Sequence, residues 1–299
     1  MQGKLLACRR ALSIHARITE HMESKAGSTA LQSGLGLGLG HGLELGSMNG
    51  QKHLGRREVF KLMEVLYRDH PGAVWRDASR KAMELCDEQK PVTNLIYGEV
   101  SYIAFVRLLD RYAPSNPVES GAVLESNHIS DHTNFTFYDL GCGAGRPVFM
   151  ACMLWTNCTK ACGIEILPSV HRMNQDLLQL YKKEILPMLH PLKQVQELSF
   201  LCDDFLRVDW SDADIVFTNA TCFDDSLFAK LEEKASRIMK EHAIFISVTR
   251  SFNNSSWELL EEQERRMSWA SSMVYVYRKK AEHPQCALSN TPPEVQKER

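Results

Sequence analysis

The 299-residue sequence has little of several features that would assign it to a class at once. Its apolar runs are all shorter than the roughly 18 residues that a membrane-spanning helix needs. Its 35 lysines and arginines nearly balance 37 acidic residues, which leaves a formal net charge of -2 and a pI of about 6.6. The strong positive charge that favours nucleic acid is therefore absent, and any binding to nucleic acid must rest on local patches.

The cysteines lack the spacing of a metal site. None of the nine forms a C-x-x-C pair, and no second pair of ligands accompanies Cys158 and Cys162. An odd number of scattered cysteines, several of them in apolar runs, argues against both a disulfide framework and a zinc site. We therefore predict reduced, buried thiols in an intracellular protein, with no metal site.

Residues 1–50 differ in composition from the rest of the chain. Residues 35–46 read LGLGLGHGLELG, and a glycine–leucine repeat of this density predicts a disordered, low-complexity tail. Residues 1–19 carry lysine and arginine but no acidic residue, which is typical of an organellar transit peptide. An unstructured basic tail and a short basic helix that touches a partner remain alternatives. Residues 281–299 are predicted to form a second disordered tail.

A mostly helical accessory segment is predicted for residues 51–134. Apolar side chains recur at helical spacing from about Arg56, again over residues 78–85, and again over residues 100–112, where the pattern ends before Pro114. Residues 114–134 are rich in Ser, Asn, Pro, Gly and His, so they predict a loop.

Residues 135–280 alternate between strand and helix patterns and form the predicted catalytic domain. Strands are predicted over residues 135–140, 161–166, 198–202, 215–219 and 243–248, with helices over 146–155, 169–186 and 224–240. Residues 273–277 (MVYVY) are typical of a further strand, which would close the sheet as part of an antiparallel pair. The alternation predicts an α/β fold with a doubly wound, mostly parallel sheet.

The most informative stretch is residues 137–145, FYDLGCGAG. An apolar run ends in Asp139, glycines follow at alternate positions, and a helical pattern comes next. Glycine permits a strand-to-helix turn with positive φ and a close approach of the backbone to a ligand. The pattern D-x-G-x-G-x-G differs from the G-x-G-x-x-G of nicotinamide enzymes. It resembles the first motif of S-adenosylmethionine-dependent methyltransferases; an ordinary glycine turn is the alternative.

Acidic residues follow the next two predicted strands. Open α/β sheets bind ligands beyond the carboxyl ends of their strands, where Glu165 and the run Asp203-Asp204-Phe205 stand. A carboxylate at Glu165 can accept from both hydroxyls of a ribose. A carboxylate after the third strand can accept from an adenine amine, and Phe205 can cover the base. Asp203 is equally suited to cap a helix.

Three further elements narrow the family. Residues 94–102 read NLIYGEVSY, residues 215–223 read IVFTNATCF, and residues 267–269 read MSW. In this order, over roughly residues 90–278, the chain resembles the non-SET, lysine-79-specific histone H3 methyltransferases (the disruptor-of-telomeric-silencing family). The resemblance implies a Rossmann-like, seven-stranded methyltransferase sheet and S-adenosyl-L-methionine as the cofactor. The Y-G-E and Ser-Trp elements are its specific parts, because many methyltransferases share the glycine motif.

The resemblance also assigns site residues by position. It implies cofactor contacts from Tyr97, Gly98, Glu99, Val100, Asp139, Gly141, Cys142, Gly143, Gly145, Arg146, Glu165, Asp204 and Phe205. It implies a lysine channel formed by Asn219, Phe223, Trp269, Tyr275 and Tyr277. Such a channel would desolvate the lysine, lower its pKa and align it for in-line attack. Aromatic faces also favour a cationic group. This chemistry requires no dedicated general base, and the amide of Asn219 is assigned to orientation. Phe223 and Trp269 could instead be ordinary core aromatics.

The chain departs from the family pattern at several places. Arg146 and Pro147 replace Gln-Val, and residues 218–221 (TNAT) replace Asn-Asn-Phe-Ala, which makes the channel wall more polar. An ungapped alignment places Val276 where the family has a channel tyrosine. The long lysine-rich segment for DNA is missing; its modest substitutes are the basic N-terminus and Arg265, Arg266, Arg278, Lys279 and Lys280.

The resemblance implies methylation of histone H3 in nucleosomes at lysine 79, and hence a nuclear protein and chromatin regulator. Open alternatives are a lysine methyltransferase of a non-histone protein, which could be cytoplasmic, mitochondrial or plastid, a small-molecule methyltransferase, and a non-catalytic scaffold. Nucleic-acid amino-methyltransferases are disfavoured because residues 219–222 (NATC) lack the Pro-Pro pair of that class. Cytosine-C5 enzymes are disfavoured because no proline precedes Cys222. The sequence indicates neither the degree of methylation nor the oligomeric state.

Overall fold

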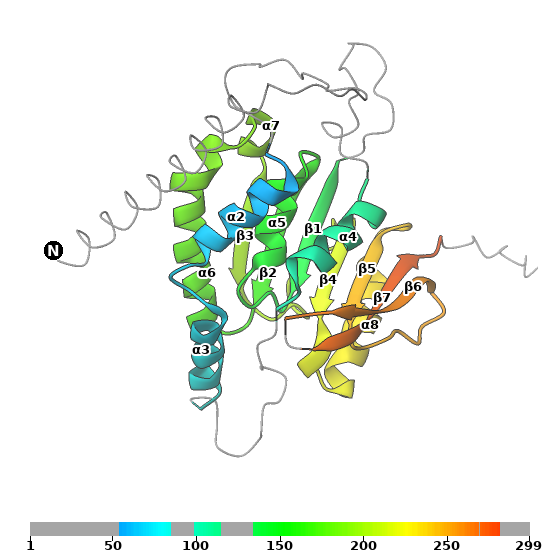
Figure 1. The fold of residues 1–299 in the computed structure, drawn as a ribbon. Helices are drawn as coiled ribbons and strands as arrows, with labels where there is room; N and C mark the ends of the chain where they lie inside the picture. Colours follow the sequence, from blue (N-terminus) through cyan, green and yellow to red (C-terminus); the bar gives the residue numbers. More distant parts are fainter. Residues whose placement is uncertain (1–53, 85–98, 115–133, 269, 282–299) are drawn as a thin grey trace, which may run out of the picture.

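The computed structural model describes residues 54–84, 99–114, 134–268 and 270–281 (Figure 1). The predicted tail over residues 1–50, nearly all of residues 281–299, and the predicted site residues Tyr97, Gly98 and Trp269 lie outside these ranges.

A mixed sheet forms the centre of the described chain. Its seven strands run in the order β3-β2-β1-β4-β5-β7-β6. The bounds are β1 (Phe135–Leu140), β2 (Cys158–Glu165), β3 (Glu197–Cys202), β4 (Ile215–Asn219), β5 (Ile244–Val248), β6 (Trp257–Arg266) and β7 (Ser271–Lys279). The first five are parallel, and β7 pairs antiparallel with both β5 and β6. The predicted seven-stranded, doubly wound sheet is confirmed. Its strand order reverses between β1 and β4, which places a ligand site at their carboxyl ends.

Helices cover both faces of the sheet. The described helices are α2 (Arg56–Leu66), α3 (Gly72–Glu84), α4 (Tyr102–Tyr112), α5 (Arg146–Leu154), α6 (Pro168–Leu180), α7 (Pro191–Gln194) and α8 (Asp225–Ile238). Apolar side chains of α2, α4, α5 and α6 share one buried cluster, and those of α8 belong to the cluster on the other face. Each described helix is too short or too polar to cross a membrane.

The accessory helices share the core of the catalytic domain. Phe105 of α4 makes edge-to-face contacts with Phe137 of β1 and Phe217 of β4, at centroid distances of 5.7 and 5.6 Å. Tyr67, which caps α2, makes a similar contact with Phe149 of α5. Figure 1 shows α2 lying across α5. In these contacts, rings of the accessory segment and rings of the catalytic domain bury one another's surface. The accessory helices are therefore part of the structure that supports the site.

The structure corrects some predicted elements. Helix α3 begins at Gly72, six residues earlier than predicted. The predicted helix over residues 169–186 ends as α6 and continues through a π-helical turn, Tyr181–Ile185, into a 3-10 turn, Leu186–Met188, because Pro187 lacks the N–H of a regular helix. Strand β6 was not predicted; its sequence WELLEEQERR is charged because it lies at the sheet edge, exposed to water.

The described cysteines are all free thiols. Cys142, Cys152, Cys158 and Cys162 are buried, as predicted. The exceptions among the described cysteines are Cys202, which is exposed at the end of β3, and Cys222, which is partly exposed.

Candidate cofactor and substrate site

The turn after β1 depends on glycine. Gly141, Gly143 and Gly145 have φ of 72°, 51° and 68°, in the left-handed region that glycine adopts most readily. A Cβ at Gly145 would lie 2.3 Å from the ring of Phe200. Gly145 is also the N-cap of α5, so the turn aims the first turn of that helix at the carboxyl ends of the strands. Close packing and backbone geometry therefore both require glycine there, as the sequence motif predicted.

Glu165 holds this turn in place. One carboxylate oxygen accepts from the amide of Gly143 and the other from the amide of Leu167, both at 2.9 Å. Burial raises the pKa of Glu165, while these backbone hydrogen bonds lower it. The carboxylate lies where the sequence predicted a ribose-binding group, and it also braces the loop that such a ligand would meet.

Asn174 of α6 is a site residue that the sequence analysis missed. Its side chain is fully buried, and its amide donates to the carbonyl of Gly143 at 2.8 Å. The sequence contained a signal, because Asn174 lies four residues from Val170 and three from Leu177 in the apolar stripe of its helix. A polar residue in that stripe needs a buried partner, which the glycine turn supplies.

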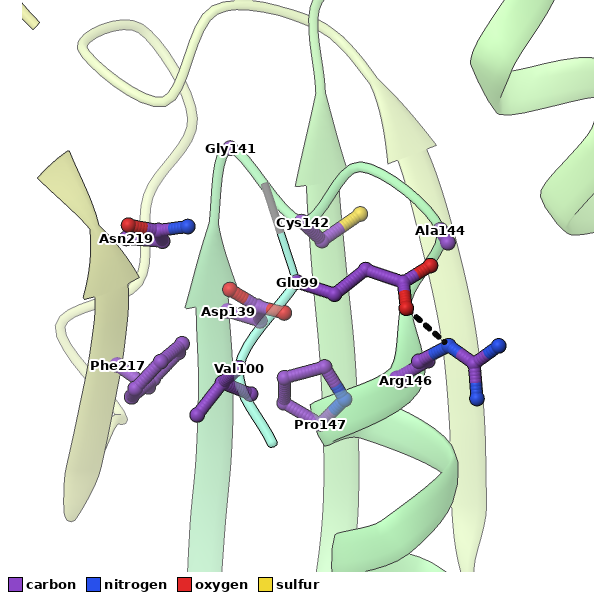
Figure 2. A pocket seen from close by; sticks show the side chains of 10 residues that line it. All are labelled: Glu99, Val100, Asp139, Gly141, Cys142, Ala144, Arg146, Pro147, Phe217 and Asn219. Carbon is purple, nitrogen blue, oxygen red and sulfur yellow. Dashed lines mark ion pairs between the residues drawn. The ribbon is translucent and has the colours of Figure 1, made fainter. Parts of the chain in front are cut away.

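A small cavity opens beside the glycine turn (Figure 2). Its lining brings together residues from the segment before α4, the end of β1 and the glycine turn, the start of α5, and β4: Glu99, Val100, Asp139, Gly141, Cys142, Ala144, Arg146, Pro147, Phe217 and Asn219. Seven of these are predicted site residues. The cavity lies where the strand order reverses, which is the expected position of a ligand in an open α/β sheet.

Asp139 lies deep in this cavity, with 2% of its surface exposed. Burial raises the pKa of its carboxyl well above the usual value, and the nearby charge of Glu165 raises it further. A buried carboxylate in the lining, with that of Glu165 nearby, favours a ligand that carries positive charge.

Arg146 closes one side of the cavity with help from the accessory segment. Its Nε lies 3.1 Å from a carboxylate oxygen of Glu99, and its guanidinium lies over the ring of Tyr67, 4.0 Å from the centroid. The Tyr67 hydroxyl donates to the carbonyl of Ala144 at 2.6 Å. Burial raises the pKa of Tyr67, so the hydroxyl keeps its proton for this bond. The sequence analysis assigned no role to Tyr67, which is 77 residues from Ala144 in the chain.

The segment before α4 is tied to the end of β6. The hydroxyl of Ser101 donates to the carbonyl of Arg266 at 3.1 Å and also caps α4 by accepting from the amide of Ala104. Val100 is buried at the cavity. Ser268 of the Ser-Trp element also donates to the carbonyl of Glu99 of the Y-G-E element at 2.8 Å, so the described residues of these two elements lie side by side.

A second group of predicted residues lies near the carboxyl ends of β1, β3 and β4. Phe205 stacks on Phe223, with centroids 5.5 Å apart, and a Cβ at Gly141 would lie 3.2 Å from Phe223. Both rings belong to the buried cluster under α8. Asp204 accepts from the amide of Leu206, and Ile166, beside Glu165, is half exposed. At this edge the exposed Ile166 lies beside the carboxylate of Glu165, while the rings of Phe205 and Phe223 are buried beneath the surface.

The predicted channel residues do not all meet at the cavity. Asn219 lines it, whereas Phe223, Tyr275 and Tyr277 lie outside its lining. Tyr277 pairs with Phe245 and stacks on Phe252 in the core; burial raises its pKa to about 12. Tyr275 lies one pleat closer to the carboxyl edge and is partly buried.

The predicted DNA patch is wrong at Lys279. Its side chain is buried, its ammonium donates to the carbonyl of Ser236, and it lies over the ring of Trp257. Arg265 is largely buried and paired with Glu261. The alternation of β7 places Lys279 inward, which composition alone could not reveal. The charge available to phosphates on this hairpin is therefore smaller than the sequence suggested.

Comparison with known proteins assigns the family. The family described as "Histone methylation protein DOT1" matches residues 79–274. The chain belongs to the DOT1 family. This membership confirms the resemblance seen in the sequence, the methyltransferase class of the enzyme, and S-adenosyl-L-methionine as its cofactor. Among the described residues, the DOT1 match takes in the whole cavity lining and excludes α2, which carries Tyr67 at its end.

One curated DOT1 relative is described as a histone-lysine N-methyltransferase, H3 lysine-79 specific, from Dictyostelium discoideum. It is 31% identical over 107 residues, which is 35% of this chain and 6% of that protein. The chain therefore spans only a small part of the length of its relative.

Solved structures with related folds are more distant. Magnesium protoporphyrin IX methyltransferase from Synechocystis, with bound S-adenosylmethionine, is 11% identical, with a TM-score of 0.42, over 73% of this chain and 97% of that one. The N-methyltransferase NodS from Bradyrhizobium japonicum is 11% identical, with a TM-score of 0.40, over 60% and 96% of the two chains. Similarity at this level carries no information about substrate.

Proposed function

We propose that this chain is an S-adenosylmethionine-dependent protein-lysine methyltransferase that acts in the nucleus on histone H3 in nucleosomes, at the lysine-79 position. The observation that carries the proposal is the cavity at the β1–β4 reversal, where Asp139, Arg146 and Asn219 converge on one glycine turn. Membership of the DOT1 family and the name of the Dictyostelium relative support the substrate.

The residues around the cavity suit the cofactor. S-adenosylmethionine supplies an electrophilic methyl on a sulfonium, together with an ammonium and a carboxylate. Asp139 and Glu165, both buried, would be compensated by its positive charges. The first turn of α5, with Arg146 at its start, favours its carboxylate. Glu165 would also hold the ribose, and Asp204 with Phe205 the adenine.

On the substrate side, the protein must hold a neutral amine in line with the methyl. Asn219, at the rim of the cavity, would orient the amine, and the apolar wall formed by Phe217 and Val100 would exclude water and favour the uncharged amine. Phe223, which stacks on Phe205, would form part of the wall between the position of the amine and that of the adenine. The lost proton would pass to solvent, since the lysine pKa falls on burial.

A second candidate is a lysine methyltransferase of a non-histone protein. The observation that favours it is the burial of Lys279 together with the pairing of Arg265, because both reduce the charge available for DNA. The site chemistry would be unchanged, and only the surface that docks the substrate would differ.

The deciding experiment is transfer of labelled methyl by the full chain. Substrates are nucleosomes, nucleosomes whose H3 lysine 79 is replaced by arginine, free histones, and a cell extract. Asp139→Ala and the closer isostere Asp139→Asn serve as controls. Label on nucleosomal H3 that is lost with the arginine replacement and with both variants supports the proposal. Label only on another protein supports the second candidate. Absence of label with intact cofactor binding overturns both.

A further inference from the structure

Thr249 has an unusual backbone conformation. It follows β5 directly and has a φ of 78°, a region that a β-branched residue rarely adopts. Its side chain is exposed, so burial of apolar surface does not compensate for the strain. Its amide donates to the carbonyl of Met273 at 2.7 Å, which fastens the strained residue to β7. Strain of this kind persists only where the surrounding structure enforces it, and it gathers at functional sites.

The Thr249 hydroxyl is part of a chain of hydrogen bonds. It lies 2.8 Å from the hydroxyl of Thr221, and Thr221 donates to the side-chain oxygen of Asn219 at 2.8 Å. A hydroxyl has a single proton to give. Because Thr221 gives its proton to Asn219, Thr249 must be the donor to Thr221.

This chain ends at the cavity. Asn219 is the last residue of β4, Thr221 lies in the turn that follows it, Thr249 follows the end of β5, and the two strands are parallel neighbours. Of the three, only Asn219 is in the cavity lining. Figure 2 shows its amide oxygen turned away from Asp139 and its amide nitrogen on the side of Asp139. The two threonines thus fix which end of the amide meets the cavity.

We propose that Thr221 and Thr249 are positioning residues that set the orientation of the Asn219 amide for the incoming amine. The proposal rests on the proposed function, because it assigns these residues to the substrate side of that site. The strained φ of Thr249 is the cost of bringing its hydroxyl to Thr221. Neither threonine touches the reacting atoms, and both act through Asn219.

The first test uses methyl transfer and melting temperature together. Thr249→Gly relieves the backbone strain and removes the hydroxyl, so it should melt at or above the wild-type temperature yet lower kcat about fivefold to tenfold. Thr221→Val, which keeps the shape and loses the hydroxyl, should lower kcat similarly. Cofactor affinity should change less than twofold. Thr249→Ser and Thr221→Ser, which keep the hydroxyl, should retain near wild-type kcat.

Coupling to Asn219 separates positioning from an independent effect. In an Asn219→Ala background, Thr249→Gly should cause no further loss of kcat, because its only route to the reaction is gone. Wild-type kcat in Thr249→Gly, equal losses in the serine variants, or additive losses in the double variant would each overturn the proposal.

A readout without activity keeps the inference apart from the proposed function. In the full chain labelled with ¹⁵N-asparagine, the side-chain amide signals of Asn219 should shift and broaden in Thr221→Val and stay near wild type in Thr221→Ser. Unchanged signals in Thr221→Val would overturn the inference even if the enzyme is active. A shift in a protein that methylates nothing would sustain the positioning and refute only the proposed function.

Discussion

Ser268 donates two hydrogen bonds to one acceptor, the backbone carbonyl of Glu99, from its hydroxyl at 2.8 Å and from its amide at 3.3 Å. The side chain of Glu99 is at the same time paired with Arg146. Glu99 therefore joins the end of the β6–β7 hairpin to the glycine turn, through a contact with Ser268 that spans 169 positions of sequence. Glu99 thereby links the predicted cofactor contacts to the β6–β7 hairpin, whose strand β7 carries the predicted channel residues Tyr275 and Tyr277.

Loss of the Ser268 hydroxyl should be felt at the cofactor site. Ser268→Ala removes one hydrogen bond to the Glu99 carbonyl, worth roughly 1 kcal/mol, so the Kd for S-adenosylhomocysteine should rise about fivefold. Titration calorimetry measures this directly. Ser271→Ala, at an exposed position of the neighbouring strand, is the matched control and should bind normally. Equal affinity in both variants would show that the hydrogen bond from Ser268 to Glu99 has no effect on cofactor binding.

Arg146 should contribute to binding of the amino-acid part of the cofactor and not to binding of its adenosine part. Arg146→Gln restores the residue of the family pattern but removes the guanidinium, and a charge-assisted contact is worth roughly 1.5–3 kcal/mol. Affinity for S-adenosylhomocysteine should fall about tenfold or more. Affinity for methylthioadenosine, which lacks the amino-acid part, should be nearly unchanged. A parallel loss for both ligands would place the effect in the loop structure rather than in carboxylate recognition.

Tyr67 should contribute to stability through one buried hydrogen bond. Tyr67→Phe leaves the Ala144 carbonyl without this donor, which should cost about 1–3 kcal/mol and lower the melting temperature by several degrees. Tyr102→Phe is the comparison, because it removes a hydroxyl that donates to the carbonyl of Arg56 at a more exposed place. Its melting temperature should fall less. Thermal unfolding followed by circular dichroism distinguishes the two.

Gly145 should tolerate no side chain. Gly145→Ala combines a positive φ with a Cβ 2.3 Å from Phe200, so we expect a loss of several kcal/mol or failure to fold. Gly72→Ala is the control: it lies in α3, has no positive φ, and its Cβ would meet only side-chain atoms at 3.3 Å or more. Soluble yield and melting temperature should separate these variants. Wild-type stability in Gly145→Ala would contradict the packing described for the turn.

Stability should depend on pH through Asp139. Its pKa is raised in the folded protein, mainly by burial and then by Glu165, so the folded state holds the proton more tightly than the unfolded state. The resulting stability is present below the ordinary carboxyl pKa, near pH 4, and is lost as the pH rises through the folded pKa.

Asp139→Asn stays neutral at every pH. Without cofactor it should therefore melt above wild type at about pH 7.5, and the difference should shrink toward about pH 4. The same variant should bind the cofactor poorly. A difference in melting temperature that is constant with pH would rule out this titration.

The central fold could be predicted from the sequence because buried strands have a simple sequence pattern. Residues 135–140 and 215–219 are short apolar runs bounded by turn residues, and both coincide with β1 and β4. Strand β6 escaped prediction for the opposite reason. At the edge of the sheet its charged side chains face water, so no apolar alternation marks it.

The candidate site was predictable only where local chemistry suffices. Asp139 and the glycines form one motif, and the glycines themselves indicate the positive φ angles of the turn. Tyr67 reaches Ala144 only through the packing of α2 on α5, which no local pattern encodes. Lysine is rarely buried, so the residue type alone does not indicate that Lys279 lies inward. That position follows from the pairing of β7.

The place of β7 in the sheet has a consequence for the fate of shortened chains. β7 is the last strand along the described chain, yet it lies between β5 and β6 rather than at the rim (Figure 1). Every residue of β5 is buried. A chain that stops before Ser271 would present this apolar strand as a bare edge, ready to pair with another molecule. A stop codon between the segments for β5 and β7 should therefore yield aggregates cleared by proteolysis, rather than a soluble, partly active domain.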